Sequence, residues 1–247
     1  MDCDKFLTTA AEDLQLGYYK DFSSSSDTLV ITFGGLFTMG VPPFEFKRIM
    51  SEFDVKRLFL RDVDRAWYQL GVRGLGEDVL SLARQLTTLR HEAHARRVVC
   101  LGASNGGFAA MMLGALIRAD VVLAFGPQTS MTQEFRETHN ETRWAEHYAK
   151  IHEGAIHGSG KMFLDAREVL LTTGAAPTYV WFPIQFQPDV LHAKHMAGVP
   201  NVTLCPFGYD HHDVVKRMRD TGHLMPEIRK AVEGPYSPKI FYRNFKP

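Results

Sequence analysis

Cysteine is scarce in this chain, and the few cysteines form no disulfide pattern. There are three in 247 residues, Cys3, Cys100 and Cys205, an odd number at wide spacings. Cys100 and Cys205 lie inside apolar runs, which is typical of buried thiols. The sequence therefore predicts free cysteines and no disulfide framework.

The chain also lacks an excess of charge of either sign and any long apolar run. Lys plus Arg and Asp plus Glu number 28 each, so the formal net charge is zero. The basic surface that nucleic acids or anionic membranes require is therefore absent. No apolar stretch reaches the roughly 18 residues of a membrane helix, and the first residues do not follow the pattern of a signal peptide. We expect a cytoplasmic protein with no nucleic-acid and no membrane partner; the sequence does not determine its oligomeric state.

Patterns that hold nucleotides and metals are missing as well. There is no Gly-x-x-x-x-Gly-Lys-Ser/Thr phosphate loop, and no Gly-x-Gly-x-x-Gly opens the first helix. His91 with His94 and His192 with His195 share an i, i+3 spacing, but neither pair has a third ligand in the pattern of a zinc site. We predict no cofactor and no metal, and we interpret these histidines as solvated surface residues.

What the sequence does contain is an alternation of short apolar runs with helical segments. Six runs rich in β-branched and aromatic residues have nearly continuous apolar character, which is typical of strands covered on both faces. They are Thr28–Phe33, Arg57–Leu60, Val98–Leu101, Val121–Phe125, Thr178–Phe182 and Val202–Pro206. Helical stretches such as Glu77–Leu89 and Phe108–Leu116 separate them. The alternation predicts a single α/β domain over residues 1–247, with a doubly wound, mostly parallel sheet.

One connection, about residues 127–176, is longer than a single crossover helix. It lies between the fourth and fifth apolar runs, and its charged and aromatic side chains recur at helical spacings. We expect a short helical insertion that covers a site. An ordinary pair of solvated helices fits the pattern equally well.

A glycine-flanked serine lies between the third apolar run and the following helical stretch. The segment reads Gly102-Ala103-Ser104-Asn105-Gly106. Small residues at a strand-to-helix turn let the chain reverse sharply, which exposes the serine hydroxyl and directs the next amide and the helix N-terminus toward it. The context predicts Ser104 as a nucleophile.

A serine nucleophile needs a histidine base and an acid that orients the histidine. Catalytic groups in parallel sheets gather beyond the carboxyl ends of the strands. The loop after the fifth run ends in Asp189, and the loop after the sixth contains His211 and His212. We predict Asp189 as the acid and His211 as the base.

Each of these assignments has an alternative. His212 is the other candidate base, since adjacent side chains diverge and only one of the two faces the serine. Asp189 is also suited to cap a helix over residues 190–196, and Asp210 and Asp213 to cap the helix that begins near residue 214. Asp62 is the alternative acid after the second run, although we expect it to hold the loop around residues 67 and 68.

Taken together, these residues resemble an α/β-hydrolase-fold serine hydrolase over about residues 28–225. The Gly-x-Ser-x-Gly motif and the order Ser104, Asp189, His211 are those of that fold. The resemblance implies that the oxyanion hole consists of the Asn105 amide and an amide of the loop after the first run, Gly35 or Leu36.

A looser likeness is to hydrolase-like proteins found with bacterial polysaccharide genes. It rests on Arg61-Asp62 with Trp67-Tyr68, on the segment 125–128 (Phe-Gly-Pro-Gln), and on Asp210-His211-His212.

The function that follows is cleavage of an ester through an acyl-enzyme. We expect a carboxylic ester, a thioester or an O-acetyl group, on a small molecule or an acylated carbohydrate. Two alternatives stand beside hydrolysis: acyl transfer on the same triad, and a catalytically silent accessory protein of the same fold. A cofactor-free lyase or a dehalogenase is disfavoured, the latter because it would need a carboxylate at position 104.

Overall fold

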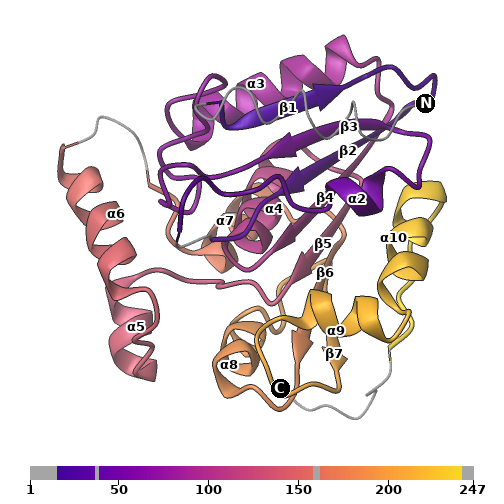
Figure 1. The fold of residues 1–247 in the computed structure, drawn as a ribbon. Coiled ribbons are helices and arrows are strands. Elements are labelled where there is room, and N and C mark those ends of the chain that lie inside the picture. The colour runs from indigo at the N-terminus through magenta and orange to yellow at the C-terminus, as the bar shows by residue number, and fades with distance from the viewer. Residues whose placement is uncertain (1–15, 37–38, 158–161, 241–247) are drawn as a thin grey trace.

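The protein is built around one twisted sheet of seven strands, which the helices cover on both faces (Figure 1). The computed structural model describes residues 16–36, 39–157 and 162–240. The strands are β1 (Tyr18–Asp21), β2 (Thr28–Phe33), β3 (Lys56–Leu60), β4 (Arg97–Ala103), β5 (Val121–Phe125), β6 (Thr178–Pro183) and β7 (Val202–Phe207). Their order is β1-β3-β2-β4-β5-β6-β7, and every pair is parallel except β1 with β3. The predicted mostly parallel α/β sheet is confirmed.

All six predicted strands are present, each within two residues of its predicted ends. The sequence analysis did not predict β1, the antiparallel edge strand. Its four residues, Tyr-Tyr-Lys-Asp, are not apolar, and none of them is fully buried. A short strand at the edge of a sheet whose side chains are not buried needs no continuous apolar run.

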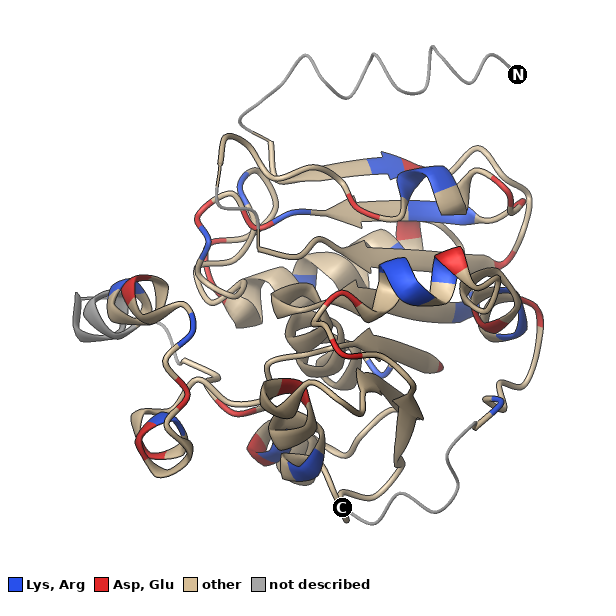
Figure 2. Cartoon of the chain, turned by 60° about the horizontal axis from the view of Figure 1, so that its bottom comes forward, with Lys and Arg blue, Asp and Glu red and all other residues tan. Residues whose placement is uncertain are grey.

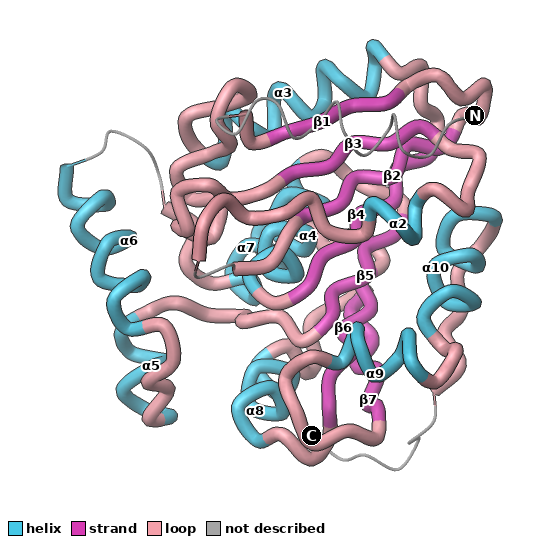
Figure 3. The backbone as a smooth tube through the Cα atoms, viewed as in Figure 1, coloured by secondary structure: helices cyan, strands magenta, loops and turns pink. Residues whose placement is uncertain are grey.

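The helices form two layers that follow from the alternation of side chains along each strand. Residues 29, 31 and 33 of β2 pack into one core with side chains of four helices: α3 (Val79–Glu92), α4 (Asn105–Leu116), α7 (Ala166–Thr173) and α8 (Gln187–His195). Val30 faces the other core, with side chains of α2 (Lys47–Met50), α9 (Val214–Asp220) and α10 (Leu224–Glu233). Figure 3 shows the strands running between these helical layers.

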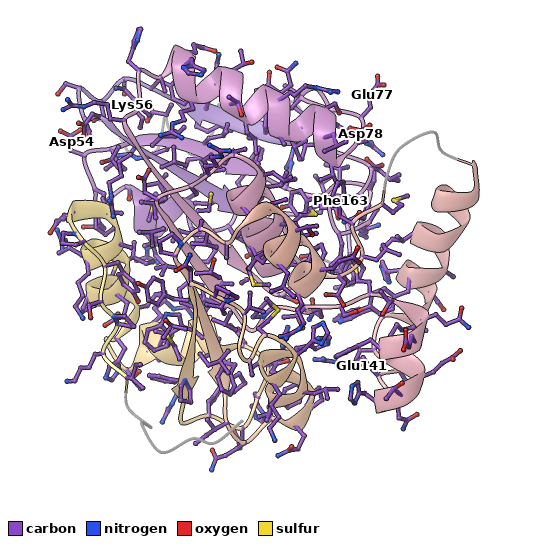
Figure 4. All side chains as sticks on the ribbon, turned by 180° about the vertical axis from the view of Figure 1, so that it is seen from behind. Asp54, Lys56, Glu77, Asp78, Glu141 and Phe163 are labelled. Atoms are coloured by element: carbon purple, nitrogen blue, oxygen red, sulfur yellow. The ribbon has the colours of Figure 1, made fainter. Side chains whose placement is uncertain are left out.

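Local signals fix where these helices begin. The side chain of Asp78, labelled in Figure 4, accepts a hydrogen bond from the Ser81 amide and closes a capping box at the start of α3. Asp213 accepts from the Lys216 amide and caps α9, as predicted. None of the described helices is long and apolar enough to cross a membrane.

The insertion is helical, as predicted, and extends beside the sheet. It contains α5 (Gln133–His139) and α6 (Ala145–His157), whose ribbons extend to one side of the sheet, followed by α7, which packs on α4 (Figure 1). The Tyr148 ring of α6 packs on Trp67, and the Phe135 ring of α5 stacks on His192. Charged residues of both signs are interspersed on the helices and loops (Figure 2). The insertion contacts the candidate site through the turn between α5 and α6.

The register of the central strands brings three loops together. Phe33 at the end of β2 lies opposite Gly102, and Ala103 at the end of β4 lies opposite Phe125. The loops that follow β2, β4 and β5 therefore leave the sheet side by side. This edge is where sites form in parallel sheets.

Candidate active site

Ser104 sits on the sharp turn between β4 and α4. Its backbone has φ 54° and ψ −122°, a conformation that L-residues rarely adopt. A Cβ on Gly102 would lie 2.0 Å from the Gly106 carbonyl oxygen, and one on Gly106 would lie 2.2 Å from the Phe33 carbonyl oxygen. Only glycine fits at these two positions, which explains both glycines of the motif.

His212, and not His211, faces the serine. His212 Nε2 lies 3.0 Å from Ser104 Oγ. His211 is exposed, and its Nδ1 lies 3.0 Å from the backbone oxygen of Asp210. The choice of His211 as the base is therefore wrong: the loop directs the first side chain to solvent and the second to the sheet edge.

Asp189 completes the arrangement. Its side chain is 1% exposed, and its Oδ2 and Oδ1 lie 2.8 and 3.0 Å from His212 Nδ1. Asp189 does not cap α8, because that helix begins at Gln187 with Phe186 at the N-cap. The structure thus brings Ser104, His212 and Asp189 into one hydrogen-bonded chain.

Asp62, the alternative acid, takes the structural role that was expected. Its carboxylate accepts a hydrogen bond from the Tyr68 amide at 3.1 Å, and the amides of Ala66 and Arg65 also donate to it. Burial raises the pKa of Asp62 to about 6, against those hydrogen bonds. Asp62 holds the loop around Trp67 and Tyr68 and has no described contact with Ser104.

Two of the predicted oxyanion donors are close to the serine in the chain or in space: Asn105 follows Ser104 directly, and a Cβ on Gly35 would lie 3.3 Å from the Ala103 carbonyl oxygen. Asn105 is the first residue of α4, so its amide has no acceptor within the helix. The Gly35 amide, in contrast, donates to the Glu45 carboxyl group. Leu36 is half-buried and packs against the core. Burial raises the pKa of Glu45, the Gly35 hydrogen bond opposes that rise, and nearby Asp213 adds to it.

Gln128 is a further residue in contact with Ser104, and no role was predicted for it from the sequence. Its side chain is buried, with Nε2 3.0 Å and Oε1 3.1 Å from Ser104 Oγ. Gln128 follows β5 in the segment 125–128 on which the looser likeness rests. The expectation that functional side chains gather beyond the carboxyl ends of the strands, which led to Asp189, also applies to the loop after β5.

The insertion contributes charge to the site through Arg143. Its guanidinium lies 3.1 Å from Asp189 Oδ1 and 2.6 Å from Glu141 Oε2. Glu141, labelled in Figure 4 near the foot of the insertion, faces His192 Nε2 at 3.5 Å. Burial acts to raise the pKa of Glu141, but the facing His192 and Arg143 hold it well below its usual range.

His192 corrects another prediction. It was interpreted as a solvated surface residue, yet it is fully buried. The Thr129 amide donates to its Nδ1 at 3.0 Å. Because Nδ1 accepts that hydrogen bond, it carries no proton, and the proton of the neutral ring lies on Nε2. Burial lowers the pKa of His192 despite the neighbouring Glu141.

No group of three or more His, Cys, Asp or Glu side chains within residues 16–36, 39–157 and 162–240 has the arrangement of a metal site. Cys100 and Cys205 are free and buried, as predicted, and burial raises the pKa of both thiols. Cys3 lies outside the described residues.

These features are those of the α/β-hydrolase fold: a mostly parallel seven-stranded sheet with an antiparallel edge strand, a serine on a strained turn after β4, an acid after β6 and a histidine after β7. No protein-family model matches the sequence, and no curated protein matches it.

Solved structures are similar to the chain in fold. The capsule O-acetyltransferase of Neisseria meningitidis serogroup A, solved in complex with CoA, has a TM-score of 0.58 at 10% identity over 84% of this chain and 90% of that chain. A carboxylesterase of Nitrososphaera gargenis has a TM-score of 0.54 at 13% identity, covering 87% and 94%. MenH from S. aureus has a TM-score of 0.53 at 14% identity, covering 88% and 98%.

Proposed function

We propose that this protein is a serine hydrolase that cleaves a carboxylic ester, a thioester or an O-acetyl group through an acyl-enzyme. The observation that carries the proposal is the chain of contacts from Ser104 Oγ to His212 Nε2 (3.0 Å) and from His212 Nδ1 to Asp189 Oδ2 (2.8 Å). Ser104 is the nucleophile, His212 the general base and acid, and Asp189 the residue that orients the ring.

In the first half of the reaction, His212 Nε2 takes the proton of Ser104 as Oγ attacks the carbonyl carbon. The carbonyl electrons move onto oxygen, and the tetrahedral intermediate collapses when His212 returns the proton to the leaving alcohol or thiol. In the second half His212 deprotonates water, which attacks the acyl group and releases Ser104. Asp189 stabilises the imidazolium that forms in each half.

The developing oxyanion needs donors near Ser104. The Asn105 amide at the start of α4 is one, and an amide of Gly35 or Leu36 is the other. Each donor contributes about 3 kcal/mol to lowering the barrier. The Gly35 amide is free for this role only when the Glu45 carboxyl group releases it.

Acyl transfer to a hydroxyl other than water is the second candidate. The fold likeness to a capsule O-acetyltransferase supports it, and the same three residues would carry it out, with a carbohydrate hydroxyl in place of water. A small molecule or an acylated carbohydrate is the proposed substrate in either case.

A fluorophosphonate probe tests the proposal, because it phosphonylates only an activated serine. We expect one adduct, on the peptide that contains Ser104, and none on a Ser104→Ala variant. An unlabelled wild-type protein beside a labelled control hydrolase would refute the proposal and favour a catalytically silent accessory protein.

The two adjacent histidines provide a matched pair. His212→Gln is expected to lower kcat/KM for p-nitrophenyl acetate by roughly 10³-fold or more. His211→Gln should leave it within about twofold, since surface substitutions away from a site have small effects. Equal losses in both variants would contradict the assignment of the base.

A further inference from the structure

A buried amide side chain contacts the reacting oxygen from outside the three residues discussed above. Gln128 is 1% exposed, and its Nε2 and Oε1 lie 3.0 and 3.1 Å from Ser104 Oγ. The loop that carries it begins at Gly126, whose φ of 52° turns the chain after β5. A Cβ on Gly126 would lie 3.1 Å from Asp189 Oδ2, so this turn also packs against the acid. Gln128 is thus held at the centre of the site.

The two polar atoms of the Gln128 amide, Oε1 and Nε2, are compatible with different positions of the Ser104 hydroxyl proton. Ser104 has one hydroxyl proton, which it donates either to His212 Nε2 or to Gln128 Oε1. If Oε1 accepts it, His212 Nε2 has no proton to remove. If Nε2 of Gln128 donates to a lone pair of Oγ, the serine proton remains on the His212 side. Only the second arrangement is compatible with general-base catalysis.

We propose that Gln128 is a further catalytic residue, whose side-chain N–H donates to Ser104 Oγ. This inference rests on the proposed function. The hydrogen bond directs the serine proton toward His212 and stabilises the negative charge that gathers on Oγ as the proton leaves. No bond to Gln128 forms or breaks: the proton moves from Oγ to His212 Nε2, and Oγ bonds to the acyl carbon.

The same hydrogen bond acts again when the acyl group leaves. In deacylation the bond between Oγ and the acyl carbon breaks, and Oγ recovers a proton from His212. A donor already at 3.0 Å stabilises the departing oxygen without any reorganisation of the site. Gln128 therefore assists both halves of the reaction.

Two substitutions separate donation from packing. Gln128→Met keeps the length of the side chain and removes the donor; we expect kcat/KM for p-nitrophenyl acetate and the fluorophosphonate labelling rate to fall about 10- to 100-fold. Gln128→Glu replaces the donor with a carboxylate that only accepts. That carboxylate draws the serine proton away from His212, so activity at neutral pH should fall further than in Gln128→Met.

The Gln128→Glu variant has a signature that a packing defect cannot produce. As the pH falls, the introduced carboxyl group takes up a proton and becomes a donor. The ratio of kcat/KM of Gln128→Glu to kcat/KM of Gln128→Met should therefore rise toward acidic pH. Gln69→Met is the control. Gln69 is equally buried, but its amide bonds the Trp67 oxygen and the Phe163 amide. We expect that variant to keep the labelling rate of its folded fraction.

The outcomes distinguish the two proposals. If wild-type protein is not labelled at Ser104, the proposed function fails. If wild-type protein is labelled, and Gln128→Met is labelled at the same rate, only the role of Gln128 fails. A constant ratio between the Gln128→Glu and Gln128→Met activities across the pH range would also overturn it.

Discussion

Arg143 places a positive charge on the far side of the carboxylate that, in the proposed function, orients the base. Its Nη1 lies 3.1 Å from Asp189 Oδ1, and the same oxygen lies 3.0 Å from His212 Nδ1. Arg143 is therefore the cationic partner of a carboxylate that is 1% exposed. Its removal should destabilise the fold, because it leaves that buried charge without the guanidinium.

Removing one partner of a buried ion pair costs about 3–5 kcal/mol. The side chains of Arg143 and Asp189 are 22% and 1% exposed, so solvent screens part of the interaction. We expect Arg143→Met to lower the free energy of unfolding by about 2 kcal/mol.

The assay is urea unfolding at pH 7, where Arg143→Met should have a lower midpoint than wild-type protein at an unchanged slope. The matched variant Arg96→Met removes an arginine from the exposed pair with Asp27, whose side chains are 85% and 48% exposed, and should cost less than about 1 kcal/mol. Equal losses in the two variants would refute the reasoning and leave Arg143 the role of an ordinary surface arginine.

Two further predictions concern stability. Ser104→Gly should be more stable than Ser104→Ala by about 1–2 kcal/mol in urea unfolding, because glycine tolerates the positive φ of this turn; equal stabilities would mean that the turn is unstrained. The folded-state pKa of Glu141 is depressed, so the stability it contributes is complete above its unfolded pKa of about 4.3 and is lost as the pH falls through the lower, folded value. Wild-type protein should exceed Glu141→Gln in unfolding free energy at pH 7 and lose that advantage below about pH 4; a constant difference between pH 7 and pH 3 would contradict this.

The sheet could be predicted from the sequence because its strands are buried on both faces. Such strands are continuous apolar runs, and β2 and β5 have the bounds that the sequence indicates. The edge strand β1 has only four residues, and none of them is buried, so it contains no comparable signal. Prediction succeeded where burial constrains the sequence and failed where it does not.

The site was predictable to the level of loops and not to the level of single side chains. Strand ends located Ser104, Asp189 and the pair of histidines. The choice within that pair depends on the turn that precedes α9. Asp213 was predicted as a cap and does cap α9, but the cap does not indicate which of the two preceding histidines faces the sheet. Arg143 gave no signal of its own, because its contact with Asp189 spans 46 residues of sequence.

The contacts of the insertion belong to a row of side chains that ends at the proposed base. The row runs from His192, which is fully buried, through Glu141 and Arg143 to Asp189. Its two carboxylates and one guanidinium give the row one net negative charge while both histidines are neutral, and in the proposed mechanism that charge is balanced once His212 takes the proton of Ser104. A buried carboxylate beside a neutral imidazole would be costly alone, and Arg143 offsets that cost. The insertion thus stabilises the Asp189 carboxylate, and the proposed proton transfer neutralises the row.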